Sequence, residues 1–246
     1  MNKIGVSLWF DSQAAEAARF YTSVFGASGI KGTAHYGEAG KEIHGQEAGT
    51  AMTVDFELDG LAFTALNGGP HFRFNPSISF FVNGRTAEEV DALWGRLAKG
   101  GKALMPLDAY PFSSRYGWVE DRYGVSWQVM LPEGEPRGKF MPSLLFVGSK
   151  CGKAQEAIDL YTSVFRNAQK GTAARFGPNR EPDREGTLMY AEFELEGRWF
   201  MISGMRENPN DMFRYLRMPL DAAGELGGFM RLRGALMNPE LRPEIA

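Results

Sequence analysis

The sequence predicts an α+β fold built from tandem βαβββ modules whose strands form curled half-barrel sheets. The first reason is an internal repeat: residues 7–10, 20–25, 31–34 and 56–60 return in the same order at 143–146, 160–165, 170–173 and 193–197. The second reason is that each copy alternates one amphipathic helix with several short apolar strands. A repeated supersecondary unit explains both observations.

The first module begins with an apolar strand at residues 6–10. Asp11 and Ser12 are N-cap candidates for the helix that follows, and Gly26 can end that helix. Residues 51–58 and 61–66 predict a hairpin around Asp59-Gly60, a pair that favours positive φ.

The second module has the same order of elements with little sequence identity. A strand at 78–82 precedes a capping box, in which Thr86 and Glu89 satisfy backbone N–H groups of the first helical turn. Two further strands close the module around Tyr123-Gly124. We therefore expect a complete two-module domain at 1–131, with modules at about 1–68 and 76–131, and a third βαβββ module at 140–205. Residues 206–246 form a divergent tail, with a weak helical pattern at 221–237.

The overall composition excludes several classes of protein. The net charge of −3 and the lack of basic runs argue against nucleic-acid binding. The chain has no apolar run long enough for a membrane span and no signal-like N-terminus. A single cysteine, Cys151, fits a reducing compartment. We expect a cytoplasmic protein.

Several motifs resemble a known family. They lie at residues 68–75, 78–83, 104–107, 110–113 and 117–128. Together they resemble the PhnB-like branch of the vicinal oxygen chelate superfamily (the glyoxalase, bleomycin-resistance and dioxygenase fold). The resemblance covers residues 3–131 and 140–205 and ends beyond 205. The branch is conventionally labelled 3-demethylubiquinone-9 3-methyltransferase, but the sequence lacks a convincing glycine-rich turn for S-adenosylmethionine.

The resemblance implies a cup between two modules, in which metal-dependent relatives bind a divalent ion through the first and last strand of each module. Here the last-strand positions carry Thr64, Gln128 and Met201, and the first-strand positions fall near Gly5, Ser77 and Met141. Only Gln128 is a plausible ligand, and one neutral amide cannot hold a catalytic metal. We expect no metal of the usual kind, and the cofactor is unknown.

Five residues are candidates for contact with a ligand in this cup. Gln128 and Thr64 occupy last-strand positions, and Trp118 and Trp9 can form an aromatic wall. His71 is either an acid–base group or a linker histidine bonded to backbone. Strand alternation predicts that Trp127, next to Gln128, faces the helix instead. The loop at 110–113 either covers the cup or is a plain surface loop.

Three functions remain open. The first is binding of a small molecule without a metal, the second is a metal-dependent isomerase, lyase or dioxygenase, and the third is the methyltransferase of the family label. Since modules one and two can pair, module three lacks a partner in its own chain. This predicts a homodimer in which module three meets its counterpart, or a tail that covers it. A frameshift after Met205 would also explain the divergent tail.

Overall fold

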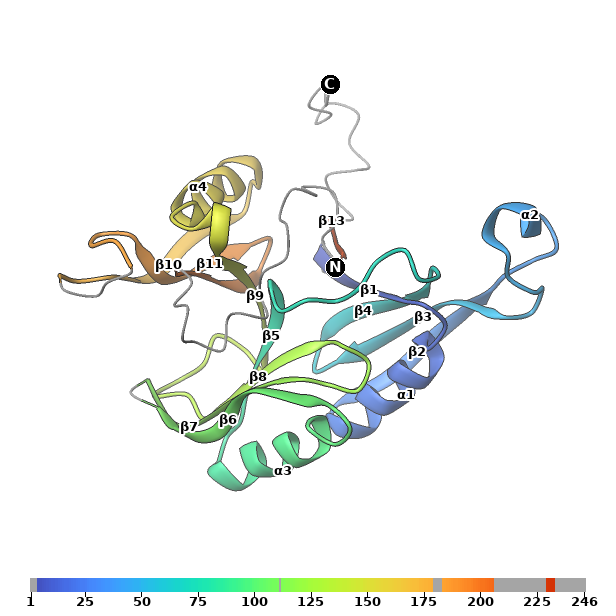
Figure 1. The fold of residues 1–246 in the computed structure, drawn as a ribbon, viewed down its shortest axis with the longest axis horizontal. Coiled ribbons are helices and arrows are strands. Elements are labelled where there is room, and N and C mark those ends of the chain that lie inside the picture. The colour runs from blue at the N-terminus through green and yellow to red at the C-terminus, as the bar shows by residue number, and fades with distance from the viewer. Residues whose placement is uncertain (1–3, 111, 179–182, 206–228, 233–246) are drawn as a thin grey trace. The chain divides into compact units, whose positions relative to one another are not determined.

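The computed structural model describes residues 4–110, 112–178, 183–205 and 229–232. Two units divide the chain: residues 1–73 with 227–246 form one, and residues 74–226 form the other. Each unit is described by itself (Figure 1). The division falls at Phe74, inside the predicted two-module domain of residues 1–131. In the described part of the chain, no helix is long and apolar enough to cross a membrane.

The first unit contains the first βαβββ module. Its elements are β1 (Ile4–Phe10), α1 (Ala14–Val24), β2 (Ser28–His35), α2 (Lys41–His44), β3 (Ala51–Leu58) and β4 (Leu61–Asn67). The sheet order is β13-β1-β4-β3-β2, with β13 (Phe229–Leu232) antiparallel to β1. Buried residues alternate along β1, β3 and β4, so that one face packs against α1. Residues 229–232 are therefore strand, whereas the sequence pattern predicted helix there.

The start of α1 differs from the sequence prediction. The N-cap is Gln13, without a side-chain cap, and neither Asp11 nor Ser12 takes that role. Instead the backbone N–H of Ala14 donates to Oδ1 of Asn67, at 2.8 Å, from the end of β4. A residue distant in sequence thus satisfies one of the free N–H groups of the first turn.

The second unit contains the second and third modules in one sheet. The second module comprises β5 (Ile78–Asn83), α3 (Ala87–Leu97), β6 (Lys102–Tyr110), β7 (Ser113–Glu120) and β8 (Ser126–Met130). The third comprises β9 (Phe140–Phe146), η1 (Gly148–Lys150), α4 (Ala154–Val164), β10 (Ala168–Arg175), β11 (Leu188–Leu195) and β12 (Arg198–Gly204). The eight strands are ordered β10-β11-β12-β9-β5-β8-β7-β6. The predicted α+β architecture of repeated modules with curled, open sheets is confirmed.

The first strands of the second and third modules join the two halves of this sheet. β5 and β9 are antiparallel, with Ser79 opposite Ser143 and Phe81 opposite Met141. The expectation that the third module lacks a partner in its own chain is therefore wrong. The edge strand β5 of the second module pairs with β9 of the third module, whereas the first module forms a separate sheet with β13.

The helices α3 and α4 pack on one face of the eight-stranded sheet. A Cβ at Gly117 in β7 would lie 2.5 Å from Cζ3 of Trp94, so α3 lies against that face. A Cβ at Gly204 in β12 would lie 3.5 Å from Cβ of Ala154, which places α4 on the same side of its strand pair. The predicted N-cap of α3 is confirmed, because the Glu89 N–H donates to Thr86; the Glu89 carboxylate accepts from the N–H of Arg85, one residue before the N-cap, and not from the first turn.

Substitution of Gly117 tests this packing. We expect Gly117→Ala to lower the free energy of unfolding by about 1–3 kcal/mol, because the added methyl group overlaps the Trp94 ring. Gly95→Ala is the control, since Gly95 is exposed in the interior of α3 with nothing within 4 Å of an added Cβ. It should raise stability by about 0.5–1 kcal/mol. Urea denaturation of both variants measures the difference, and equal effects would contradict this packing.

Candidate functional site

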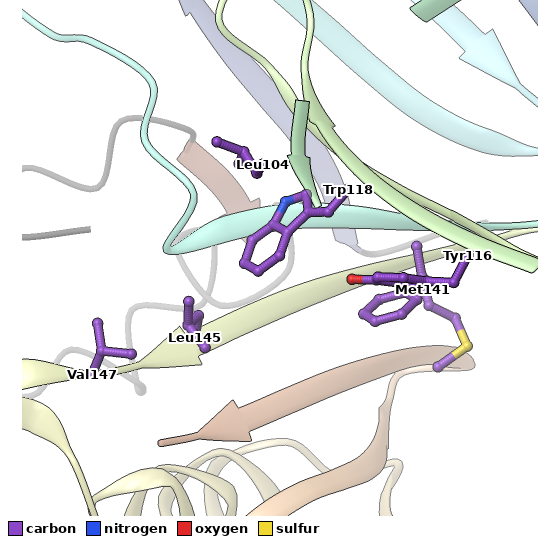
Figure 2. Packing of buried hydrophobic residues seen from close by; sticks show 7 residues of the cluster. Leu104, Tyr116, Trp118, Met141, Leu145 and Val147 are labelled. Carbon is purple, nitrogen blue, oxygen red and sulfur yellow. The ribbon is translucent and has the colours of Figure 1, made fainter. Parts of the chain in front are cut away.

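The face of the eight-stranded sheet opposite α3 and α4 carries a large apolar cluster. Because side chains alternate along a strand, Tyr116 and Trp118 point away from the helix face of Gly117. The cluster face is defined by seven buried residues, Phe81, Leu104, Tyr116, Trp118, Met141, Leu145 and Val147. Partly buried Met105, Tyr110, Met130, Trp199, Met201 and Met205 pack against them. Figure 2 shows that members from β6, β7 and β9 share this cluster.

A hydrogen-bonded network of three buried side chains lies on the same face of the sheet. The hydroxyl of Tyr116 donates to Oε1 of Gln128 at 2.5 Å, and Nε2 of Gln128 donates to Oγ of Ser79 at 2.7 Å. Burial raises the pKa of Tyr116 well above its ordinary value, so the phenol stays protonated. In the described part of the chain, no buried side-chain nitrogen or oxygen lacks a hydrogen-bond partner. The network is therefore uncharged and internally satisfied.

The strand register relates the first-strand and last-strand positions of the second and third modules to one another. Gln128 lies beside Phe81 of β5, and Met201 lies beside Ser143 of β9. Because Phe81 is opposite Met141 and Ser79 is opposite Ser143, the equivalent first-strand residues are Ser79 and Met141. By this register the residue of the second module equivalent to Met141 is Ser79, which lies one side-chain repeat of the strand after Ser77. Ser79, Gln128, Met141 and Met201 are called the corner residues.

The corner residues offer few suitable metal donors. They supply one hydroxyl, one amide whose oxygen and nitrogen are both hydrogen-bonded, and two thioethers. Among the described residues, no group of three or more His, Cys, Asp and Glu side chains could hold a metal ion. Thioethers are soft ligands that suit Cu(I) rather than the hard or borderline divalent cations. The donor set does not fit such a cation.

Aromatic rings gather at the end of the β6–β7 hairpin. Tyr110 stacks on Phe112 with ring centroids 5.8 Å apart, and both rings contact the edge or face of Tyr116 at 5.4 and 5.0 Å. Phe112 is 52% exposed. In the predicted loop at 110–113, the rings of Tyr110 and Phe112 thus form a path of contacts. It leads from the solvent-exposed Phe112 to the buried Tyr116–Gln128–Ser79 network.

Two of the five predicted ligand-contacting residues lie on the cluster face. Gln128 belongs to the network, and the buried Trp118 donates its Nε1–H to Oγ of Ser126 at 2.7 Å. Trp127 is fully buried, packs against Phe80 with tilted rings and donates to Asp121, as expected for a residue on the other side of β8.

The other three predicted residues belong to the first unit. Trp9 donates to the carbonyl of Gly69 at 2.8 Å and packs against Phe72. Thr64 donates to Asp55 at 2.5 Å, and His71 is exposed. The five candidates are therefore divided between the two units.

Sequence reasoning missed Tyr116, Ser79 and Trp199 on the cluster face. The signal for Tyr116 was present, because it lies two residues before Trp118 on one strand and so shares its face. Ser79 and Trp199 required the strand register, which the sequence pattern does not supply.

Comparisons with known proteins place this geometry in a family. The 3-demethylubiquinone-9 3-methyltransferase family matches residues 2–130 and 138–214. The PhnB protein of Bacillus cereus is 40% identical, over 52% of this chain and 98% of its own, with a TM-score of 0.48. Glyoxalase I from Zea mays is 11% identical, over 80% of this chain and 64% of its own, with a TM-score of 0.52, which indicates a shared fold alone. No curated protein matches the chain.

The repeated βαβββ modules, the joined eight-stranded sheet and the long sequence match support the same family assignment. The chain belongs to the 3-demethylubiquinone-9 3-methyltransferase family, in the PhnB-like branch of the vicinal oxygen chelate superfamily.

Proposed function

We propose that the protein binds a small, largely apolar aromatic molecule on the cluster face of its second unit, without the metal that relatives of this superfamily use. The observation that carries the proposal is the Tyr116–Gln128–Ser79 network at the corner positions. It fills the expected ligand positions with neutral groups that already bond to one another.

The apolar side chains around the network support this class of ligand. Met105, Met130, Met141 and Met201 pack on or against the cluster. Methionine side chains are flexible and polarisable, so they adapt to ligands of irregular shape and make favourable contacts with aromatic rings. Trp118 and Tyr116 add flat aromatic surfaces beside them.

The structure removes the argument by which the sequence predicted a homodimer. That expectation required a third module without a partner, and β9 pairs with β5 instead. The proposal therefore concerns one chain and one unit. A cytoplasmic location remains a prediction from the single cysteine.

Fluorescence titration with N-phenyl-1-naphthylamine, a neutral aromatic probe, tests the proposal. We expect saturable binding that survives treatment with EDTA, and Trp118→Ala should weaken it about tenfold through loss of aromatic contact area. Trp94→Ala is the matched control, because Trp94 lies on the helix side of the same unit, against Gly117, and its loss should leave the affinity unchanged.

Three results would contradict the proposal. They are an absence of probe binding, binding that requires a stoichiometric divalent ion in the purified protein, and equal effects of the two tryptophan variants. Calorimetry with S-adenosylmethionine should detect no binding, whereas binding would favour the methyltransferase alternative.

The buried Tyr116 hydroxyl gives a second test, based on pH. Tyr116→Phe leaves Oε1 of Gln128 without its donor and should cost about 1–3 kcal/mol near neutral pH. Burial raises the pKa of Tyr116 in the folded protein, so only the unfolded tyrosine ionises above about pH 10. The wild type thus loses stability there that the variant does not lose, and the difference between them should shrink. Urea denaturation at several pH values measures it, and a difference that grows with pH would contradict the assigned environment.

A further inference from the structure

We propose that Arg137 is an anion-binding residue at one end of the cluster face, so that the ligand combines an aromatic body with a carboxylate-like or sulfonate-like group. This inference rests on the proposed function, because it assigns a second chemical feature to the same ligand.

Arg137 lies over an aromatic ring that belongs to the cluster face. Its guanidinium carbon is 4.3 Å from the ring centroid of Trp199, within the range of a cation–π contact. Trp199 is partly buried and packs against the cluster of Phe81, Tyr116 and Trp118. The charge of Arg137 is therefore held next to the apolar surface on which the ligand body would lie.

The position of the Trp199 ring depends on a glycine in the neighbouring part of the sheet. A Cβ at Gly171 in β10 would lie 2.5 Å from Cζ3 of Trp199 and 3.1 Å from Cβ of Glu192. Any other residue at 171 would displace the ring. Because residue 171 has no side chain, the third module has space for the Trp199 indole, against which the Arg137 guanidinium packs.

Glu192 holds Arg137 only loosely. Its Oε2 lies 3.6 Å from Nε of Arg137, which is beyond a direct hydrogen bond. No other residue in the described ranges makes an ion pair or hydrogen bond with Arg137. A guanidinium has five N–H donors in a planar fork that suits two oxygens of an anion. The Arg137 side chain is 47% exposed, compared with 18% for Glu192, so the positive group is the more accessible one.

The buried polar groups at the centre of the face do not compete for that anion. Gln128, Tyr116 and Ser79 are neutral and bonded to one another. A ligand anion would therefore be directed toward Arg137, while the aromatic body lies on Trp199, Met201 and Met141. Arg137 would set the polarity and orientation of the ligand.

Two fluorescent probes of the same skeleton separate the charge from the apolar body. 8-Anilinonaphthalene-1-sulfonate carries a sulfonate that N-phenyl-1-naphthylamine lacks. The quantity of interest is the ratio of the dissociation constant of the neutral probe to that of the anionic probe. Taking this ratio cancels changes in the apolar surface or in folding that affect both probes alike.

We expect Arg137→Gln to lower this ratio about tenfold, as for loss of a charge-assisted hydrogen bond. Glu192→Gln should raise the ratio several-fold, because it removes the carboxylate that competes for the guanidinium. Arg122→Gln is the matched control: Arg122 also lies over an aromatic ring, that of Tyr123 at 5.3 Å, but in the turn between β7 and β8. It should leave the ratio unchanged.

The failure of this inference can be distinguished from failure of the proposed function. If both probes bind and the ratio is the same in wild type and Arg137→Gln, Arg137 only fastens the segment before β9 to the sheet, and the inference is overturned. An unchanged ratio in Glu192→Gln would overturn it as well. If neither probe binds, the proposed function itself is wrong.

Discussion

The antiparallel pairing of β5 with β9 is the constraint on which the second unit depends. Each module has one sheet face packed under its own helix and its first strand at one edge of its half-sheet. Joining the two first strands covers these two inner edges, leaves β10 and β6 as the outer edges, and makes the opposite faces continuous. Met141 and Leu145 from β9 then share a cluster with Phe81, Tyr116 and Trp118 from the second module. Neither module could assemble this face by itself, so the pairing produces the candidate site as well as the sheet.

The chemistry of the joined face follows from the Tyr116–Gln128–Ser79 network at its centre and from Arg137 over Trp199 at one end. At the centre, hydroxyl and amide groups satisfy one another, and a phenol kept neutral by burial completes them. Such a centre is suited to recognising a ligand by its shape and by weak polar contacts. It is not suited to activating an oxygen atom bound to a metal. At the end, Arg137 over Trp199 supplies an accessible positive group. This polarity suits the amphipathic aromatic ligand that we propose, and a fold by itself does not decide between binding and catalysis.

Local patterns in the sequence predicted local structure well. The N-cap at Thr86 and the helix-facing Trp127 were both readable, because each depends on residues a few positions apart. The first helix start was missed because its cap is Asn67, far along the chain. The pairing of modules was also missed, since β1, β5 and β9 are all apolar first strands and no pattern says which edges meet. Gln128 was proposed from its spacing after Gly124 together with the family resemblance, but its hydrogen bonds to Ser79 and Tyr116 depend on register across three strands.

A cross-strand disulfide tests the β5–β9 pairing most directly. Ser79 and Ser143 are opposite each other, and Cys151 is the single native cysteine, so a Ser79→Cys, Ser143→Cys, Cys151→Ser variant has one possible intramolecular disulfide. Mild oxidation followed by non-reducing electrophoresis and mass spectrometry should show an internally cross-linked monomer. A disulfide-linked dimer would mean that the second module pairs with the third module of another chain, and two free thiols would mean that these strands do not pair. Either result would contradict the joined sheet within one chain.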